Sequence, residues 1–87
     1  MSDKYRVSIE PRAWKQLMGL SQPIQEKLLI SIEGLENQPR PSGCKKLKAK
    51  GGLFRIRVGD FRVIYDVMDA VLVVLIVEVG DRKEVYD

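Results

Sequence analysis

Apolar and polar residues alternate in three stretches of the chain, and this period of two predicts β-strands. The first stretch is residues 4–9. Two more, residues 54–58 and 61–67, are separated only by Gly59 and Asp60, a pair typical of a two-residue hairpin turn. The sequence therefore predicts an opening strand and, later, a β-hairpin.

Between the first strand and the hairpin, apolar residues recur every three or four positions, which predicts two helices. Pro11 suits the first turn of one helix, and Ser21 is a suitable N-cap for the other. The apolar positions are Ala13, Trp14, Leu17 and Met18 in the first helix and Ile24, Leu28, Ile32 and Leu35 in the second. Two prolines and a glycine in residues 37–43 then predict a loop.

Residues 71–79 are apolar on both faces until Glu78, which is typical of a strand in the middle of a sheet. We expect residues 45–50 to link the preceding loop to the hairpin. The element order β-α-α-β-β-β predicts an α+β fold, in which a helical hairpin packs on one face of a small, twisted, mainly antiparallel sheet. A length of 87 residues suits one modest core, so we expect a single domain over residues 1–87.

Positive charge is concentrated in one part of the chain. The formal net charge is only +3. Eight lysines and arginines nevertheless lie between residues 40 and 62, against a single acid, Asp60. The eight are Arg40, Lys45, Lys46, Lys48, Lys50, Arg55, Arg57 and Arg62. A local basic field of this kind indicates a polyanionic partner.

The composition also limits the chemistry. The chain has no histidine, so it lacks the usual general acid–base group and the commonest metal ligand. Cys44 is the only cysteine, and the acids are scattered, so we expect neither a metal nor a cofactor. The longest apolar run, residues 70–77, is far shorter than the roughly 20 residues that span a bilayer. The N-terminus also lacks the pattern of a signal peptide. We therefore expect a cytoplasmic protein without a membrane partner.

The hairpin has one apolar and one cationic face. Arg55 and Arg57 alternate with apolar residues, and a turn at Gly59 and Asp60 would pair Arg57 with Arg62. Like charges directly opposite each other destabilise a sheet, so their presence together indicates an anion as the ligand. The alternative is an ordinary solvated face of a half-exposed sheet.

Several segments follow one another in a specific order and spacing. They are the opening strand before a helix with Pro and Ala, Leu35-Glu-Asn-Gln-Pro39, Lys46-Leu47 before a glycine, residues 54–65, and residues 79–86. Over nearly the whole chain, this pattern resembles the RelE/ParE superfamily of bacterial toxins from toxin–antitoxin pairs. The resemblance implies two possible activities. RelE-like members cleave mRNA in the ribosomal A site without a metal, using the 2′-hydroxyl as nucleophile, whereas ParE-like members poison DNA gyrase.

The resemblance implies site residues at the matching positions. Arg55 and Arg57 match two basic positions on the first hairpin strand, and Arg62 matches an arginine on the next strand. Arg82 and Tyr86 match an arginine and a tyrosine after the last strand. The implied catalytic roles are activation of the 2′-hydroxyl by Arg57, transition-state stabilisation by Arg62, leaving-group protonation by Arg82 and base stacking by Tyr86.

Other basic residues are expected to bind rather than to react. RNA or antitoxin contacts are predicted for Arg55, Lys45, Lys46, Lys48 and Lys50, and a merely solubilising basic loop is the alternative for the lysines. RelE itself has lysines where this chain has Arg55 and Arg57. An arginine side chain stays protonated near neutral pH, so Arg57 is expected to act through its charge and not as a literal base.

The leading hypothesis is a metal-independent endoribonuclease, an mRNA interferase that acts on mRNA held by the ribosome against ribosomal RNA. By resemblance, a small cognate antitoxin would cover its basic face. The alternatives are a gyrase inhibitor of the ParE type without catalysis, and a degenerate member that only binds RNA. The presence of all five basic and aromatic site positions favours cleavage.

Overall fold

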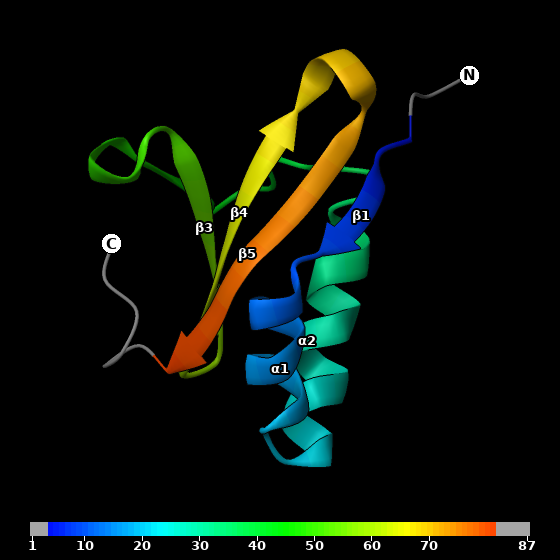
Figure 1. Ribbon diagram of the computed structural model, residues 1–87, viewed down its shortest axis with the longest axis vertical. Coiled ribbons are helices and arrows are strands. Elements are labelled where there is room, and N and C mark those ends of the chain that lie inside the picture. The colour runs from blue at the N-terminus through cyan, green and yellow to red at the C-terminus, as the bar shows by residue number, and fades with distance from the viewer. Residues whose placement is uncertain (1–3, 82–87) are drawn as a thin grey trace.

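Within residues 4–81, which the computed structural model describes apart from the side chain of Lys50, the chain forms two layers. One is a five-stranded sheet, and the other is a helical hairpin on one face of that sheet (Figure 1). The elements are β1 (Arg6–Ile9), α1 (Pro11–Met18), α2 (Gln22–Gly34), β2 (Lys45–Leu47), the 3-10 turn η1 (Lys48–Lys50), β3 (Leu53–Val58), β4 (Phe61–Met68), the 3-10 turn η2 (Asp69–Val71) and β5 (Val73–Asp81).

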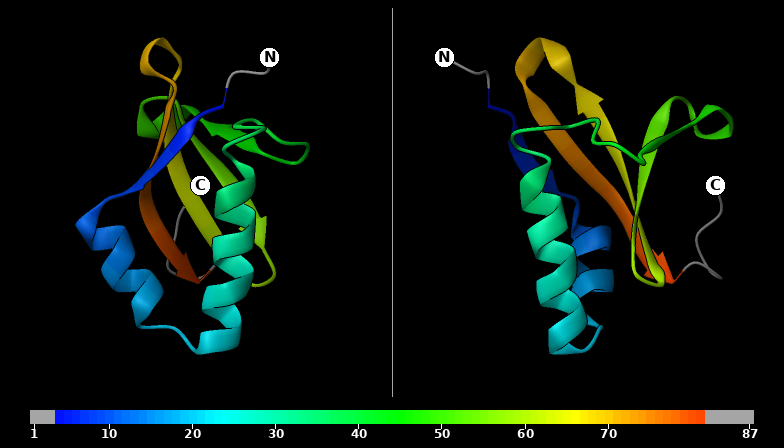
Figure 2. Two further views of the ribbon diagram at one scale, coloured as in Figure 1. Left: turned by 90° about the vertical axis from the view of Figure 1, so that its right-hand side faces the viewer. Right: turned by 180° about the vertical axis from the view of Figure 1, so that it is seen from behind.

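The strands follow the order β1-β5-β4-β3-β2 across the sheet. Strand β1 runs parallel to β5, and the other neighbouring pairs are antiparallel. Figure 2 shows from two further sides that both helices cover the same face. The predicted α+β fold with a helical hairpin on a mainly antiparallel sheet is confirmed. Strand β5, predicted to lie mid-sheet, is an interior strand with β1 on one side and β4 on the other.

Helix α1 is held against the sheet by a single apolar stripe. Ala13 and Leu17, four residues apart, are fully buried, and Pro11 lies in the first turn as predicted. Trp14 and Met18 lie on the outer side, and 48% of the Trp14 surface is exposed. The apolar set predicted for this helix therefore divides into a core pair and an exposed pair, because a helix of eight residues contacts the sheet along one line.

Helix α2 follows its predicted pattern more closely. Ser21 is its N-cap residue, and Leu28, Ile32 and Leu35 are buried in the main core, with Ile24 partly buried beside them. Neither helix among the described residues is long and apolar enough to cross a lipid bilayer.

The basic stretch 45–50 is more ordered than the predicted linker. It forms β2, which pairs with β3, and then the short turn η1. The reason is a second, smaller apolar cluster, in which Leu47 and Ile64 are buried against Leu53 and Val77. Since Leu47 lies opposite Leu53, this cluster fixes the β2–β3 end of the sheet. Figure 1 shows this end, drawn in green, standing away from the two helices.

A β-bulge changes the alternation of β5. Tyr65 lies opposite Ile76, but Ile64 lies opposite Glu78, so Val77 is the extra residue. Up to the bulge, even-numbered residues of β5 enter the main core; beyond it, Val79 does. The shift turns Glu78 away from the helices, onto the face that β3 and β4 share with their arginines.

The loop before β2 is fastened to the sheet by Arg40. Its guanidinium makes two hydrogen bonds to the Asp69 carboxylate, of 3.2 and 2.7 Å, and lies 5.1 Å from the centre of the Phe54 ring. The Tyr5 hydroxyl also donates to Asp69. Together, Arg40 and Tyr5 lower the pKa of Asp69 to about 2. Arg40 therefore has a structural role, in which it links the loop before β2 to the turn after β4.

Tyr65 fastens the same loop from inside the core. Its hydroxyl donates a 2.8 Å hydrogen bond to the carbonyl of Pro39, and its ring stacks on Phe54 with the centres 5.9 Å apart. Burial, with a smaller contribution from Cys44, raises the pKa of Tyr65. The hydroxyl therefore stays protonated and remains a donor near neutral pH.

Candidate functional site

The β3–β4 hairpin closes where the sequence predicts. Gly59 and Asp60 form the turn, and Gly59 has a φ of 62°, in the left-handed region that glycine adopts without strain. Arg57 then lies directly opposite Arg62. Arg57 is exposed and Arg62 is partly buried. The prediction of two opposed cations on neighbouring strands is therefore confirmed.

Two more cations share this face of the sheet. Arg55 lies opposite Ile64 on one side and opposite Lys45 on the other. Arg55 is only 5% exposed, whereas Lys45 is exposed. A guanidinium in such an environment is less screened by water than one on an open surface, so its charge acts more strongly on nearby groups. The face away from the helices thus presents a basic surface made of Arg55, Arg57, Arg62 and Lys45, called the basic face below.

The remaining predicted lysines are not all on the basic face. Lys46 lies opposite Phe54, whose ring belongs to the helix side, so alternation directs Lys46 to the other side of the sheet from Lys45. Lys48 is exposed in η1, at the rim of the β2–β3 end. The side chain of Lys50 lies outside the described part of the chain.

Two predicted catalytic residues, Arg82 and Tyr86, also lie outside the described residues. Strand β5 can be followed to Asp81, which lies opposite Phe61, and its neighbour Gly80 lies opposite Arg62. The described part of β5 therefore ends beside the β3–β4 turn and the opposed arginines.

Glu78 is a charged residue of this face that sequence patterns did not assign. It lies opposite Ile64, in the row that also contains Arg55 and Lys45, and it is partly buried. The apolar run before it gave no alternation from which to predict its direction. The signal that places it is the bulge at Val77, which is visible only once β4 and β5 are paired.

The end of β5 is supported by helix α1. Pairing with β1 stops at Ile76, and beyond it the side chain of Gln16 takes over, accepting a 2.8 Å hydrogen bond from the backbone N–H of Val79. Val79 is itself buried. This contact fixes the strand between Glu78 and Gly80, on the side where no neighbouring strand holds it.

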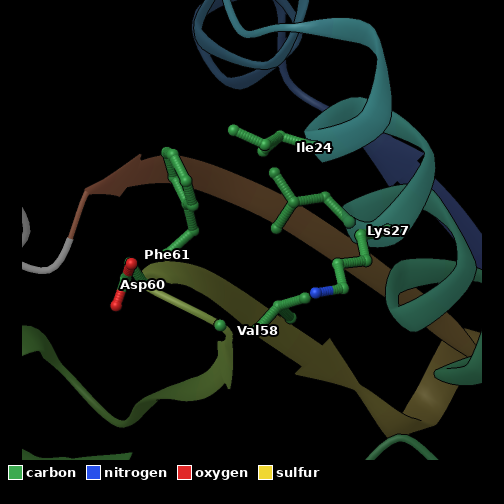
Figure 3. A pocket seen from close by; sticks show the side chains of 7 residues that line it. Ile24, Lys27, Val58, Asp60 and Phe61 are labelled. Atoms are coloured by element: carbon green, nitrogen blue, oxygen red, sulfur yellow. The ribbon is translucent and has the colours of Figure 1, made fainter.

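A small pocket lies on the other side of the hairpin, between the turn and α2. It has a volume of about 180 Å³ and is lined by Ile24, Lys27, Leu28, Val58, Gly59, Asp60 and Phe61. Figure 3 shows Ile24 and Lys27 reaching from α2 toward Val58 and Phe61. None of the predicted site residues lines this pocket. Chemistry that uses the arginines must therefore take place on the basic face.

The donor groups suit an anion better than a metal. Among residues 4–81, no three histidine, cysteine, aspartate or glutamate side chains are grouped so that they could hold a metal ion. Closely spaced guanidinium groups bind phosphate oxygens through charge-assisted hydrogen bonds. The arrangement can therefore hold a phosphodiester and stabilise charge that develops on it.

Comparison with known proteins places the chain among toxins. The model of the family described as ParE toxin of type II toxin–antitoxin system, parDE, matches residues 7–86. A Methanocaldococcus jannaschii protein named as a RelE1 toxin is 31% identical over 86 residues, covering 95% of this chain and 96% of the relative.

Solved structures agree in fold. A chain of the archaeal RelE–RelB complex from Pyrococcus horikoshii has a TM-score of 0.81 and 32% identity, covering 98% of this chain and 100% of that chain. A chain of the toxin–antitoxin complex RelBE2 from Mycobacterium tuberculosis has a TM-score of 0.80 and 26% identity, with 91% and 99% covered.

Proposed function

Because the chain belongs to the RelE/ParE superfamily and is a RelE-type toxin of a toxin–antitoxin system, we propose that it is a ribosome-dependent endonuclease that cuts mRNA in the A site. The observation that carries the proposal is the opposition of Arg57 and Arg62 on a sheet face that the helices leave uncovered. Two cations that lie opposite each other can both donate charge-assisted hydrogen bonds to one phosphate.

The proposed reaction needs no metal. The 2′-oxygen of the ribose attacks the adjacent phosphorus, the bond from phosphorus to the 5′-oxygen breaks, and the products are a 2′,3′-cyclic phosphate and a 5′-hydroxyl. Arg62 stabilises the negative charge of the pentavalent transition state, and Arg57 lowers the cost of forming the 2′-oxyanion by its positive charge. Arg82 protonates the leaving oxygen and Tyr86 stacks on a base, as the family resemblance implies.

The ribosome would supply alignment. An unconstrained RNA linkage rarely holds its 2′-oxygen in line with the leaving oxygen, and fixing that geometry contributes strongly to catalysis. Arg55, Lys45 and Lys48 would hold neighbouring phosphates of mRNA or ribosomal RNA, and Lys46 and Lys50 remain predicted contacts. Action on ribosomes implies a cytoplasmic site of action.

We further propose a small antitoxin as the regulatory partner. The similar chains from P. horikoshii and M. tuberculosis come from toxin–antitoxin complexes. A partner that covers the basic face would neutralise Arg57 and Arg62 and exclude RNA from them. Acidic residues in the covering segment would complement this surface.

Primer extension on mRNA from cells that briefly express the protein tests the proposal. We expect cuts within translated codons for the wild type, and their loss in the Arg62→Ala and Arg82→Ala variants. Removal of one such charge contact typically lowers the rate about a hundredfold or more. Purified protein should cut free mRNA poorly, and efficient cleavage without ribosomes would contradict the aligning role of the ribosome.

A second function deserves a parallel test because the matching family model describes ParE toxins. A gyrase inhibitor of that type would leave mRNA intact and accumulate gyrase cleavage complexes on DNA. Supercoiling assays on the same preparations separate the two. Intact mRNA together with inhibited gyrase would replace the nuclease proposal.

A further inference from the structure

We propose that Glu78 is the proton acceptor for the attacking 2′-hydroxyl, a catalytic residue that the positional match to the family does not supply. The inference rests on the proposed nuclease function and names the missing base of that same site. Arg57, the residue matched to hydroxyl activation, carries a guanidinium group, which has donors but no acceptor and therefore contributes charge only. A separate group must take the proton.

The position of Glu78 follows from the bulge in β5. With unbroken alternation after Ile76, residue 78 would point into the main core and Val79 toward the basic face. The extra residue Val77 reverses this order, so that Val79 is buried and Glu78 lies opposite Ile64. Bulges commonly occur next to active sites, where they redirect a side chain. Here the redirected side chain carries a carboxylate.

The surroundings of Glu78 are mostly cationic. Since Gly80 lies opposite Arg62, Glu78 is the diagonal neighbour of Arg62, a spacing of roughly 7–8 Å in antiparallel sheets. Arg55 and Lys45 continue its own row on β3 and β2. This spacing lets Glu78 and Arg62 reach one ribose–phosphate linkage, the carboxylate at the hydroxyl and the guanidinium at the phosphate.

Two further charged groups face the same region. Arg57 lies beyond Arg62 on β3, and Asp66 is the diagonal neighbour of Glu78 on the other side of Ile64. Asp66 lies opposite Leu75, two residues farther from the opposed arginines than Ile64. Asp66 lies on the same strand as Arg62 and has the same charge and sheet face as Glu78. Because it lies away from the phosphate position, it is a matched control for Glu78.

The step balances without any additional reagent. A Glu78 oxygen accepts the proton of the 2′-hydroxyl as the bond from the 2′-oxygen to phosphorus forms. The bond to the 5′-oxygen then breaks, and that oxygen takes a proton from the general acid proposed above, Arg82, which regains a proton from water after the product leaves. Glu78 returns its proton to water after the product leaves. General base catalysis by a positioned carboxylate contributes about 10²- to 10⁴-fold.

The test is single-turnover cleavage of mRNA on programmed ribosomes at one neutral pH for the wild type, Glu78→Gln and Asp66→Asn. We expect Glu78→Gln to cleave at least about a hundredfold more slowly. Its affinity for ribosomes should be retained, because glutamine keeps the size of the side chain and removes a negative charge. Asp66→Asn should keep the rate of the wild type.

The outcomes separate this inference from the proposed function. If Glu78→Gln cleaves within about threefold of the wild type, while Arg62→Ala is inactive, the nuclease stands and Glu78 is not its base. A wild-type protein that does not cleave on ribosomes overturns both. Glu78→Asp provides a second variant, and a rate between those of the wild type and Glu78→Gln would support the carboxylate role. Thermal unfolding checks that each variant is folded.

Discussion

Arg57 and Arg62 lie directly opposite each other across the β3–β4 hairpin, although both carry a positive charge. A cross-strand pair of opposite charges contributes roughly 0.2–1 kcal/mol to a sheet, and like charges reverse the sign. The repulsion between these two side chains therefore opposes the pairing of β3 with β4. This relationship makes separate predictions for stability and for activity.

Removing one of the opposed charges should stabilise the free protein. Arg57→Gln should raise the free energy of unfolding by up to about 1 kcal/mol, because Arg62 then has no cation opposite it. The gain should shrink in 1 M salt, which screens charge over about 3 Å. Urea unfolding at low and high salt measures both effects. Arg6→Gln is the control, because Arg6 is also an exposed strand residue but lies opposite Val73; an equal gain there would refute the explanation.

Replacing Arg57 by another cation should cost much less activity than removing its charge. If Arg57 acts by charge, Arg57→Lys should cleave within about tenfold of the wild type, whereas Arg57→Gln should lose about a hundredfold. Single-turnover rates on programmed ribosomes compare the two. Equal losses in both variants would show that the planar guanidinium, with its paired donors, is required and not the charge alone.

The parts of the fold that local signals determine could be predicted from the sequence. Gly59 and Asp60 define a two-residue turn, and this turn alone sets Arg57 opposite Arg62. Helical spacing likewise identified the buried face of α2, with Leu28 and Ile32. In both cases the deciding interactions lie within a few residues of each other along the chain.

What could not be predicted depends on pairing between distant segments. The direction of Glu78 follows from the bulge, and an uninterrupted apolar run such as that of β5 has no period that reveals one. Strand β2 was not predicted, because its lysines give no apolar alternation. Its one buried residue, Leu47, packs in the cluster with Ile64. Arg40 counted as part of a basic field, but in the fold it binds Asp69. The sequence therefore predicted the cations of the basic face but not its acidic residue, Glu78.

Loss of the Gln16 side-chain acceptor should loosen the end of β5. In Gln16→Leu the buried N–H of Val79 loses its hydrogen bond, at a cost of about 1–3 kcal/mol in the free energy of unfolding. Amide exchange at Val79 should become faster, and cleavage should fall because Glu78 and Gly80 flank this position. Gln16→Glu keeps an acceptor oxygen and should preserve the slow exchange. Unchanged protection of Val79 in Gln16→Leu would show that the contact does not hold the strand.

The contribution of Asp69 to stability should depend on pH in a defined direction. Hydrogen bonds from Arg40 and Tyr5 lower the pKa of Asp69 to about 2, from an ordinary value of 3.8. A lowered pKa means that the ionised carboxylate favours the folded state, so its contribution is complete above about pH 5 and is lost progressively as the pH falls through about 2. Asp69→Asn should therefore unfold at lower urea concentration than the wild type at pH 7, and the difference should narrow toward pH 2. A double-mutant cycle with Arg40→Gln isolates the pair: the coupling free energy should be favourable at pH 7 and much smaller at pH 2, and a coupling of equal size at both pH values would contradict the assignment to the ionised carboxylate.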